Sequence, residues 1–271
     1  LIYCQFMDAV RFLGRHIRGL PMDRDGVIPE ALEAACREHG ARVVYLTPTL
    51  QNPTNIVMSE ERRRALARMA ERHDLLIIED DVYGYLIEDR PPTLATLAPE
   101  HTVHVTSVSK VLAPGLRVGW TAAPAAHVAR LAEAQRVTAV CPPALTGEVV
   151  RLWIEDGSAD AHIQWLRAET RARYEMALEY LADWSLRGHP ASFHLLLELP
   201  PAWPSDTFAS AARERGVGVL PASAFATEPG NGAGTVRLSL SQPPSRAALA
   251  RGLGILRELL GMLPAQRPAI I

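Results

Sequence analysis

A set of polar side chains follows closely on three short apolar runs of this sequence, ARVVYL, LLIIE and TVHVT. The set consists of Asn52 after the first run, Asp80 and Tyr83 after the second, and Ser107, Ser109, Lys110 and Arg117 after the third. A lysine amine flanked by hydroxyl groups can form an imine with an aldehyde. An arginine and a serine hydroxyl can hold a phosphate. The set therefore predicts a ligand that carries both an aldehyde and a phosphate.

Pyridoxal 5'-phosphate (PLP) is a ligand of this kind, and it accounts for the remaining side chains. A buried carboxylate, Asp80, can keep the pyridine nitrogen protonated, which makes the ring an electron sink for a carbanion at the substrate's alpha carbon. Tyr83 and Asn52 can donate to the 3'-oxygen of the ring and stabilise its anion. Lys110 can hold the cofactor and then move a proton at the alpha carbon. The structural alternatives are a solvated lysine, a capped strand end, a packed phenol and a turn-shaping amide.

These groups need strands whose carboxyl ends meet at one edge of a sheet, where open α/β folds bind ligands. The first half of the chain predicts such strands at 41–46, 75–79, 102–106 and 116–123. Helices are predicted at 29–39, from Ser59 up to the second strand, and from Pro124 onward. Strands that alternate with helices indicate an α/β sheet that is buried on both faces.

The second half of the chain has a different pattern. A long helix is predicted at 161–186, followed by strands at 193–200, 216–221 and 235–240 and helices at 206–215 and 245–260. We therefore expect a large α/β domain at 1–160, and a connecting helix with a smaller α+β domain at 161–271.

In their order along the chain these motifs resemble the fold-type I PLP-dependent enzymes, in particular the class I/II aminotransferases. The resemblance is carried by Asn52-Pro53-Thr54, by Asp80-x-x-Tyr83, by Ser107-x-x-Lys110 with Arg117-Val118-Gly119, and by Arg237 in TVRLSLS. It implies that Arg237 and Asn52 bind the substrate's alpha-carboxylate, that the substrates are an amino acid and a 2-oxo acid, and that the protein is a homodimer. Ion pairing of Arg117 and an exposed strand position for Arg237 are the structural alternatives.

Two departures from the family pattern concern the turn and the start of the chain. Asn55 stands where the family has glycine, and asparagine tolerates the positive φ of such a turn. The chain begins at Leu1, and the resemblance implies a preceding segment with a phosphate-binding helix start and an aromatic ring that stacks on the cofactor. We therefore expect a large domain that is incomplete at its N-terminus.

Three functional hypotheses follow. The first is a PLP-dependent aminotransferase. The run SVSKVLAPGLRVGW is most similar to the aminotransferase-like domain of MocR-type regulators of the GntR superfamily, so the second is an effector-sensing domain that follows a winged-helix DNA-binding domain. The third is an inactive truncated homologue.

Composition excludes other classes. The 28 Lys+Arg and 30 Asp+Glu give a net charge of -2, which argues against nucleic-acid binding by this segment. No apolar run reaches the roughly 20 residues that span a membrane. Three cysteines without metal-ligand spacing indicate reduced thiols in the cytoplasm, and no metal site is predicted. The run Arg62-Arg63-Arg64 is expected on a solvated helix face, and Trp153, Trp165 and Trp184 are expected to pack.

Overall fold

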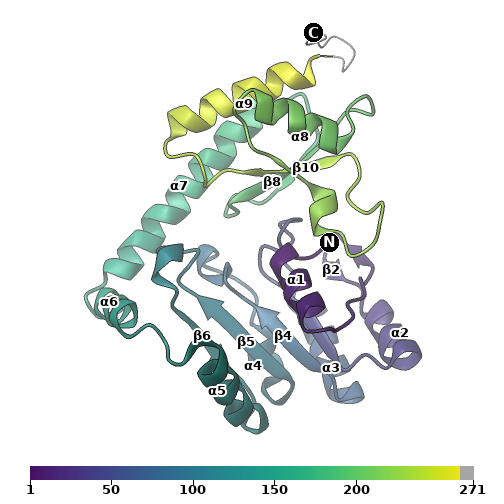
Figure 1. The fold of residues 1–271 in the computed structure, drawn as a ribbon, viewed down its shortest axis with the longest axis vertical. Helices are drawn as coiled ribbons and strands as arrows, with labels where there is room; N and C mark the ends of the chain where they lie inside the picture. Colours follow the sequence, from purple (N-terminus) through teal and green to yellow (C-terminus); the bar gives the residue numbers. More distant parts are fainter. Residues whose placement is uncertain (263–271) are drawn as a thin grey trace. The chain divides into compact units, whose positions relative to one another are not determined.

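The structure, a computed structural model, describes residues 1–262 of the chain (Figure 1). These residues form two compact units. We call residues 20–50 and 56–167 the parallel-sheet unit, and residues 1–19, 51–55 and 168–262 the antiparallel-sheet unit. The boundary between 167 and 168 lies close to the predicted one at 160, but residues 1–19 and 51–55 group with the C-terminal part of the chain.

The parallel-sheet unit contains four strands in the order β3-β4-β5-β6, of which the first three are parallel and the last is antiparallel. They are β3 (Val43–Leu46), β4 (Leu76–Asp80), β5 (Thr102–Ser107) and β6 (Gly119–Ala122). A two-stranded hairpin precedes them, made of β1 (Met22–Asp23) and β2 (Gly26–Val27). All four predicted strands of the first half are therefore confirmed.

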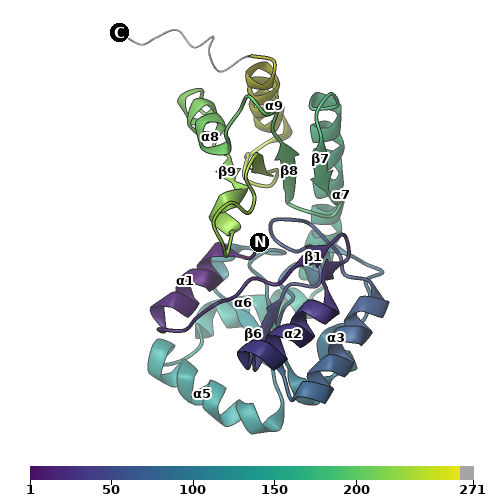
Figure 2. The same ribbon diagram turned by 90° about the vertical axis from the view of Figure 1, so that its right-hand side faces the viewer.

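The helices of this unit are α2 (Pro29–His39), α3 (Glu60–His73), α4 (Leu94–Leu97), α5 (Ala125–Ala139) and α6 (Ala144–Glu155), with short 3-10 turns at η1 (Gly84–Leu86), η2 (Pro99–His101) and η3 (Pro114–Leu116). Proline at the first position of α2 and Gly40 after its end, at φ +63°, explain its length. The Ser59 hydroxyl caps α3 by accepting from the Arg62 N–H at 3.2 Å. Helices α2 and α3 contact each other (Figure 2).

Strand alternation divides the side chains of this sheet between two environments. Val44, Leu46, Ile77 and Glu79 are buried, and the first three belong to a core with α3. Tyr45, Leu76, Ile78 and Asp80 occupy the alternate positions and are half-buried. Tyr45 of β3 and Asp80 of β4 therefore share the face opposite the core with α3, together with Leu76 and Ile78.

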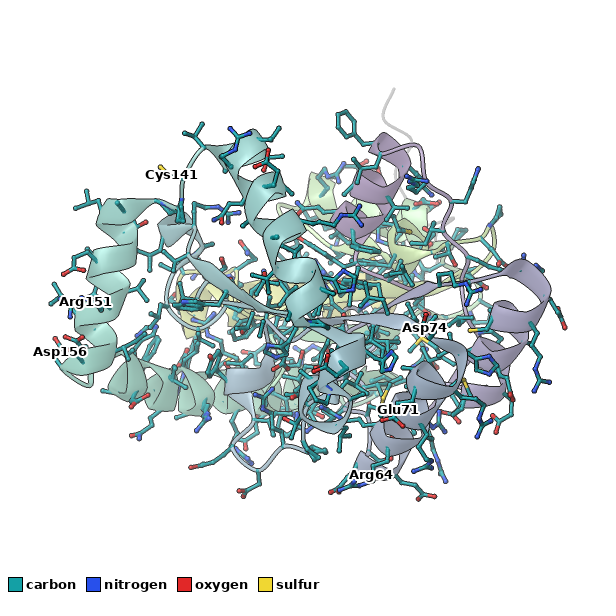
Figure 3. All side chains as sticks on the ribbon, turned by 90° about the horizontal axis from the view of Figure 1, so that it is seen from below. Arg64, Glu71, Asp74, Cys141, Arg151 and Asp156 are labelled. Atoms are coloured by element: carbon teal, nitrogen blue, oxygen red, sulfur yellow. The ribbon has the colours of Figure 1, made fainter. Side chains whose placement is uncertain are left out.

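The expectation of a solvated arginine run was wrong for Arg63, whose side chain is 0 % exposed. Its guanidinium donates to backbone carbonyls and a hydroxyl within the same unit, namely Pro48 O, Thr49 Oγ1, Met58 O and Pro92 O, at 3.0 to 3.2 Å. Arg64, the next residue, is exposed and pairs with Glu60 (Figure 3). Helix geometry turns successive residues by about 100°, so adjacent arginines can lie in opposite environments.

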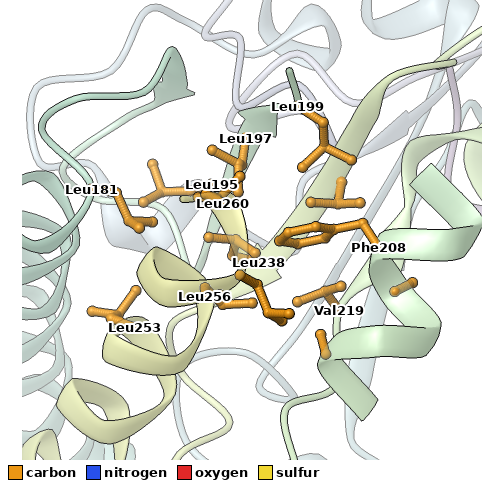
Figure 4. Close-up of a cluster of buried hydrophobic side chains, with 14 of the residues drawn as sticks. Leu181, Leu195, Leu197, Leu199, Phe208, Val219, Leu238, Leu253, Leu256 and Leu260 are labelled. Carbon is orange, nitrogen blue, oxygen red and sulfur yellow. The ribbon is translucent and has the colours of Figure 1, made fainter. Parts of the chain in front are cut away.

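The antiparallel-sheet unit has four strands in the order β7-β8-β10-β9, and every neighbouring pair is antiparallel. They are β7 (Leu186–Gly188), β8 (His194–Glu198), β9 (Leu220–Pro221) and β10 (Thr235–Ser239), accompanied by α1 (Cys4–Phe12), α8 (Ser205–Glu214), η4 (Ala222–Phe225) and α9 (Arg246–Leu260). Leucines of β8, β10 and α9 form its core with Phe208 of α8 (Figure 4). Helix α7 (Ser158–Tyr180) runs along the chain from one unit into the other.

Three predictions about the second half need correction. The helix predicted at 161–186 begins at Ser158 and ends at Tyr180. It does not reach residue 186, because residues 186–188 pair with β8 as strand β7. The strand predicted at 216–221 is reduced to Leu220–Pro221. Trp165 is 58 % exposed and Trp153 is 37 % exposed, whereas Trp184 packs against the core as predicted. Helical periodicity identifies a face but does not say which face is covered.

None of the helices within residues 1–262 has both the length and the apolar character needed to cross a membrane. Within the same part of the chain, no group of three or more His, Cys, Asp or Glu side chains is arranged to hold a metal ion. Cys4, Cys36 and Cys141 are free thiols, and Cys141 is exposed (Figure 3).

Candidate active site

Asp80 is the last residue of β4, and its carboxylate has partners from two places in the parallel-sheet unit. The Tyr45 hydroxyl of β3 donates to Oδ2, and the Val82 N–H donates to Oδ1 at a long 3.4 Å. Burial raises the pKa of Asp80, while the bonds from Tyr45 and Val82 and the charge of Lys110 lower it and only partly offset the burial. The ionised form of Asp80 is therefore stabilised by the hydrogen bonds from Tyr45 and Val82 against the effect of burial.

Lys110 lies on the turn that follows β5. The backbone of this turn is held by bonds from Leu112 N to Val108 O at 2.8 Å and from Ser109 N to the Ser107 hydroxyl at 2.9 Å. The Lys110 Nζ is 5.8 Å from the centroid of the Tyr83 ring, and Tyr83 is buried. The structure therefore places the predicted amine beside the predicted phenol, and the charge of Lys110 lowers the pKa of Asp80.

Ser107, Ser109 and Arg117 share the segment that joins β5 to β6. Arg117 is exposed, has a positive φ of +56°, and donates to the Pro114 carbonyl at 3.2 Å. Gly119 follows where a side chain has no room, because an added Cβ would lie 2.8 Å from Thr106 O. The two serines thus lie on the turn that carries Lys110. Arg117 lies further along the same segment and is exposed. Their part in phosphate binding stays a prediction.

Asp81, the residue after β4, is buried and faces a different set of groups. Its carboxylate is paired with the Arg90 guanidinium and lies 3.1 Å from Nε2 of His104. Burial by itself raises the pKa of Asp81, but the bonds to His104 and Arg90 outweigh it and leave the pKa below its usual value. The same bond raises the pKa of His104, against the effect of its own partial burial. These contacts give Asp81 a structural role, in which it holds the turn that follows β4.

This pair predicts a pH-dependent stability. Because the pKa of His104 is higher in the folded protein, its protonated form stabilises the fold, and this contribution is complete below the pKa of the unfolded chain, about 6.5. The contribution is lost as the pH rises through the pKa of the folded protein. The lowered pKa of Asp81 stabilises the fold above about 3.9 and is lost as the pH falls through its folded pKa. Urea unfolding of the natural protein and of His104→Gln should therefore differ most between these values, and the difference should shrink toward alkaline pH. His101→Gln serves as the control, and a pH-independent difference would contradict the assignment.

The antiparallel-sheet unit holds the other two predicted site residues. Arg237 of β10 donates from Nη1 to Oδ1 of Asn52 at 2.9 Å, and its guanidinium carbon lies 4.7 Å from the centroid of the Phe225 ring. Asn52 is buried in the turn at 51–55. Asn55 has a φ of +63°, which confirms that asparagine adopts the turn conformation, and its side-chain oxygen accepts from the Ser192 hydroxyl. A guanidinium oriented by an amide and an aromatic ring suits a planar carboxylate.

Sequence reasoning missed two residues of these clusters, Tyr45 and Phe225. The phenol of Tyr45 lies within a strand that was interpreted as apolar, and its contact with Asp80 depends on the pairing of β3 with β4. A usable signal was the strand alternation, which puts Tyr45 on the opposite face from the buried Val44 and Leu46. For Phe225 no sequence signal pointed to Arg237.

Comparison with known proteins decides the family. A sequence profile of the family Aminotransferase class I and II matches residues 3–251. The chain belongs to this family. The chain is 30% identical over 239 residues to the uncharacterized HTH-type transcriptional regulator YdfD of Bacillus subtilis, spanning 84% of this chain and 49% of that protein. It is 26% identical to aromatic-amino-acid aminotransferase 1 of Thermococcus litoralis, spanning 82% of this chain and 57% of that protein.

Solved structures agree with the family. The crystal structure of an archaeal alanine:glyoxylate aminotransferase matches with a TM-score of 0.87 and 29% identity, covering 96% of this chain and 67% of that one. The predicted fold, a fold-type I α/β domain with a smaller α+β part, is therefore confirmed. The chain spans about half the length of the curated regulators that it matches.

The residues present fit PLP, the cofactor that the family implies. A pyridine nitrogen needs an acidic partner, an aldehyde needs an amine, and a phosphate needs hydrogen-bond donors. Asp80 supplies the carboxylate, Lys110 beside the buried Tyr83 supplies the amine, and Ser107 and Ser109 supply hydroxyl groups. Asp80, Tyr83, Lys110, Ser107 and Ser109 are therefore the residues of the parallel-sheet unit that would hold the cofactor.

Proposed function

We propose that this class I and II aminotransferase chain transfers an amino group between an amino acid and a 2-oxo acid with the help of PLP. The observation that carries the proposal is the position of the Lys110 amine beside the buried Tyr83, in the same unit in which the carboxylate of Asp80 ends β4. When bound, PLP supplies an electron sink for the negative charge that develops at the alpha carbon of the substrate. Sequence similarity to named aminotransferases supports the same activity.

Each residue has a separate task in this proposal. Lys110 provides the amine that attaches the cofactor, and it accepts and returns the proton at the alpha carbon of the substrate. Asp80 holds the proton on the ring nitrogen, and Tyr83 and Asn52 donate to the ring oxygen. The phosphate is bound by a set of hydroxyl and guanidinium groups, namely Ser107, Ser109 and Arg117. Arg237, oriented by Asn52, binds the alpha-carboxylate of the substrate.

The direct test uses purified protein, PLP, a panel of amino acids and 2-oxoglutarate. Formation of glutamate together with the 2-oxo acid of the donor supports the proposal. A protein that binds no PLP, as judged by its visible absorbance, contradicts it.

A second candidate is an effector-sensing domain of a MocR-type regulator, in which the same residues bind PLP and an amine without turnover. It is favoured by the similarity to HTH-type transcriptional regulators of Bacillus subtilis. PLP binding without any amino transfer, accompanied by an amine-dependent change in absorbance, is the result that distinguishes it from the enzyme.

We also propose a homodimer and a cytoplasmic location. Large apolar side chains of the α5–α6 region are exposed, among them Val128, Val137, Val140 and Leu145, and such a surface is typical of an interface between subunits. The three free thiols are those of a protein kept in a reducing compartment.

The role of Arg237 predicts a change that depends on the substrate. Arg237→Ala should lower kcat/KM for an amino acid by about 10²- to 10³-fold, because a charge-assisted bidentate contact is lost. Arg237→Lys should recover only part of this loss, since an ammonium group lacks the planar fork. An amine without a carboxylate should react equally well with both variants and with the natural protein. Arg187→Ala, an exposed arginine of the same unit, is the control. An equal loss for the amine would show that Arg237 does not act on the carboxylate.

A further inference from the structure

Tyr45 contacts the acid of the proposed cofactor site from the neighbouring strand. In the parallel pairing of β3 with β4, Tyr45 is opposite Ile78, and Asp80 lies two residues further along on the same face. From this position the Tyr45 hydroxyl donates to Oδ2 of Asp80. The contact therefore follows from strand register, and it joins the centre of one strand to the carboxyl end of the next.

The carboxylate of Asp80 has a conflict to resolve if it is to hold a protonated ring nitrogen. It must stay ionised, yet burial and the neighbouring Asp81 carboxylate both favour its neutral form. The groups that oppose them are the Tyr45 hydroxyl, the Val82 N–H and the Lys110 charge. The Lys110 amine is taken up by the cofactor in the proposed function, and the Val82 contact is long at 3.4 Å. Tyr45 is thus the donor whose bond to Asp80 does not depend on the state of Lys110.

We propose that Tyr45 is a positioning residue for Asp80: its hydroxyl fixes Oδ2, so that Oδ1 serves the ring nitrogen of PLP. This inference rests on the proposed function, because it gives Asp80 the task of binding that nitrogen. Tyr45 itself does not touch the reacting atoms. Its effect on PLP must therefore pass through Asp80, which makes it separable by experiment.

The test compares PLP dissociation constants for the natural protein, Tyr45→Phe, Asp80→Asn and the double variant, measured by titration of the visible absorbance. Tyr45→Phe should weaken PLP binding by about ten- to a hundredfold, as expected for the loss of a hydrogen bond to a charged group. In the Asp80→Asn background the same change should alter binding less than about twofold, because the partner of the hydroxyl is already neutral. Tyr85→Phe, which removes an exposed phenol from the turn after β4, should leave binding unchanged.

A second measurement does not need bound cofactor. The carboxyl carbon of Asp80, followed by ¹³C NMR in the PLP-free protein, should titrate at a higher pH in Tyr45→Phe than in the natural protein. In step with this shift, the loss of PLP binding on acidification should begin at a higher pH in the variant. A role in packing alone would move neither curve.

The outcomes separate this inference from the proposed function. If the natural protein binds no PLP, the proposed function fails and the inference fails with it. If the natural protein binds PLP and Tyr45→Phe binds it equally well, or weakens binding equally in the Asp80→Asn background, only the role of Tyr45 is overturned. If Tyr45→Phe does not fold, Tyr45→His, which retains a donor, should fold. In Tyr45→His, the loss of PLP binding on acidification should begin at the same pH as in the natural protein. If Tyr45→His folds but loses PLP binding at a higher pH than the natural protein, the positioning role of Tyr45 is also overturned.

Discussion

Replacing Lys110 with alanine is expected to abolish the visible absorbance of bound PLP and to lower amino transfer by at least about 10²- to 10⁴-fold, because the same amine attaches the cofactor and moves the proton. Lys110→Arg should be equally inactive, since a guanidinium stays protonated and does not attack an aldehyde. Absorbance spectra and the rate of glutamate formation measure the two effects. Retained absorbance in Lys110→Ala would place the attachment elsewhere.

Composition makes this experiment unusually clean. Lys110 is the only lysine in the sequence, because every other member of the 28 Lys+Arg is arginine. Treatment with PLP and borohydride, which fixes PLP permanently on an amine, should therefore label one side chain. Peptide mass spectrometry should find the label at residue 110 and should find no side-chain label in Lys110→Ala. The terminal amine is distinguished by its own peptide.

The second large effect concerns stability. Arg63→Met should lower the free energy of unfolding by about 3–5 kcal/mol, because it removes the hydrogen bonds that a fully buried guanidinium donates. The carbonyls of Pro48, Met58 and Pro92 would each lose a hydrogen bond, and these residues belong to the loops that leave β3 and enter α4. Urea unfolding followed by circular dichroism measures the loss.

Arg64→Met is the matched control, since it changes the adjacent, exposed arginine of the same helix and should alter stability by less than about 0.5 kcal/mol. Equal effects of the two substitutions would mean that the buried hydrogen bonds of Arg63 contribute little. Among the bonds described for residues 1–262, none joins Arg63 to Asp80, Tyr83 or Lys110. Folded Arg63→Met should therefore bind PLP as well as the natural protein does, and binding should be lost only at urea concentrations that unfold the variant.

The sequence allowed the strand ends to be predicted more reliably than the contacts between them. Asp80 and Tyr83 were found because a compact apolar run ends directly before them, and a run of that kind has few alternatives to a buried strand. The positive φ of Asn55 was predictable because only a few residue types adopt that conformation. Both conclusions depend on local properties of the chain.

Arg63, Tyr45 and the end of α7 could not be predicted because each is decided by distant partners. Arg63 is buried because carbonyls from several loops converge on it, and the charge pattern of the helix holds no sign of them. The bond from Tyr45 to Asp80 requires the register of two strands. The predicted helix extended to Leu186, yet Leu186 belongs to strand β7, which pairs with β8.

Three successive acids at the end of β4 have three separate surroundings. Glu79 is fully buried and accepts from the N–H groups of Leu94 and Ala95, Asp80 accepts from Tyr45, and Asp81 is paired with Arg90. Because neighbouring positions of a strand point in opposite directions, loss or gain of one residue in β4 would send each carboxylate to the wrong partners at once. Evolution can therefore vary the loops around this strand in length, but it can change β4 itself only by exchanging one side chain for another.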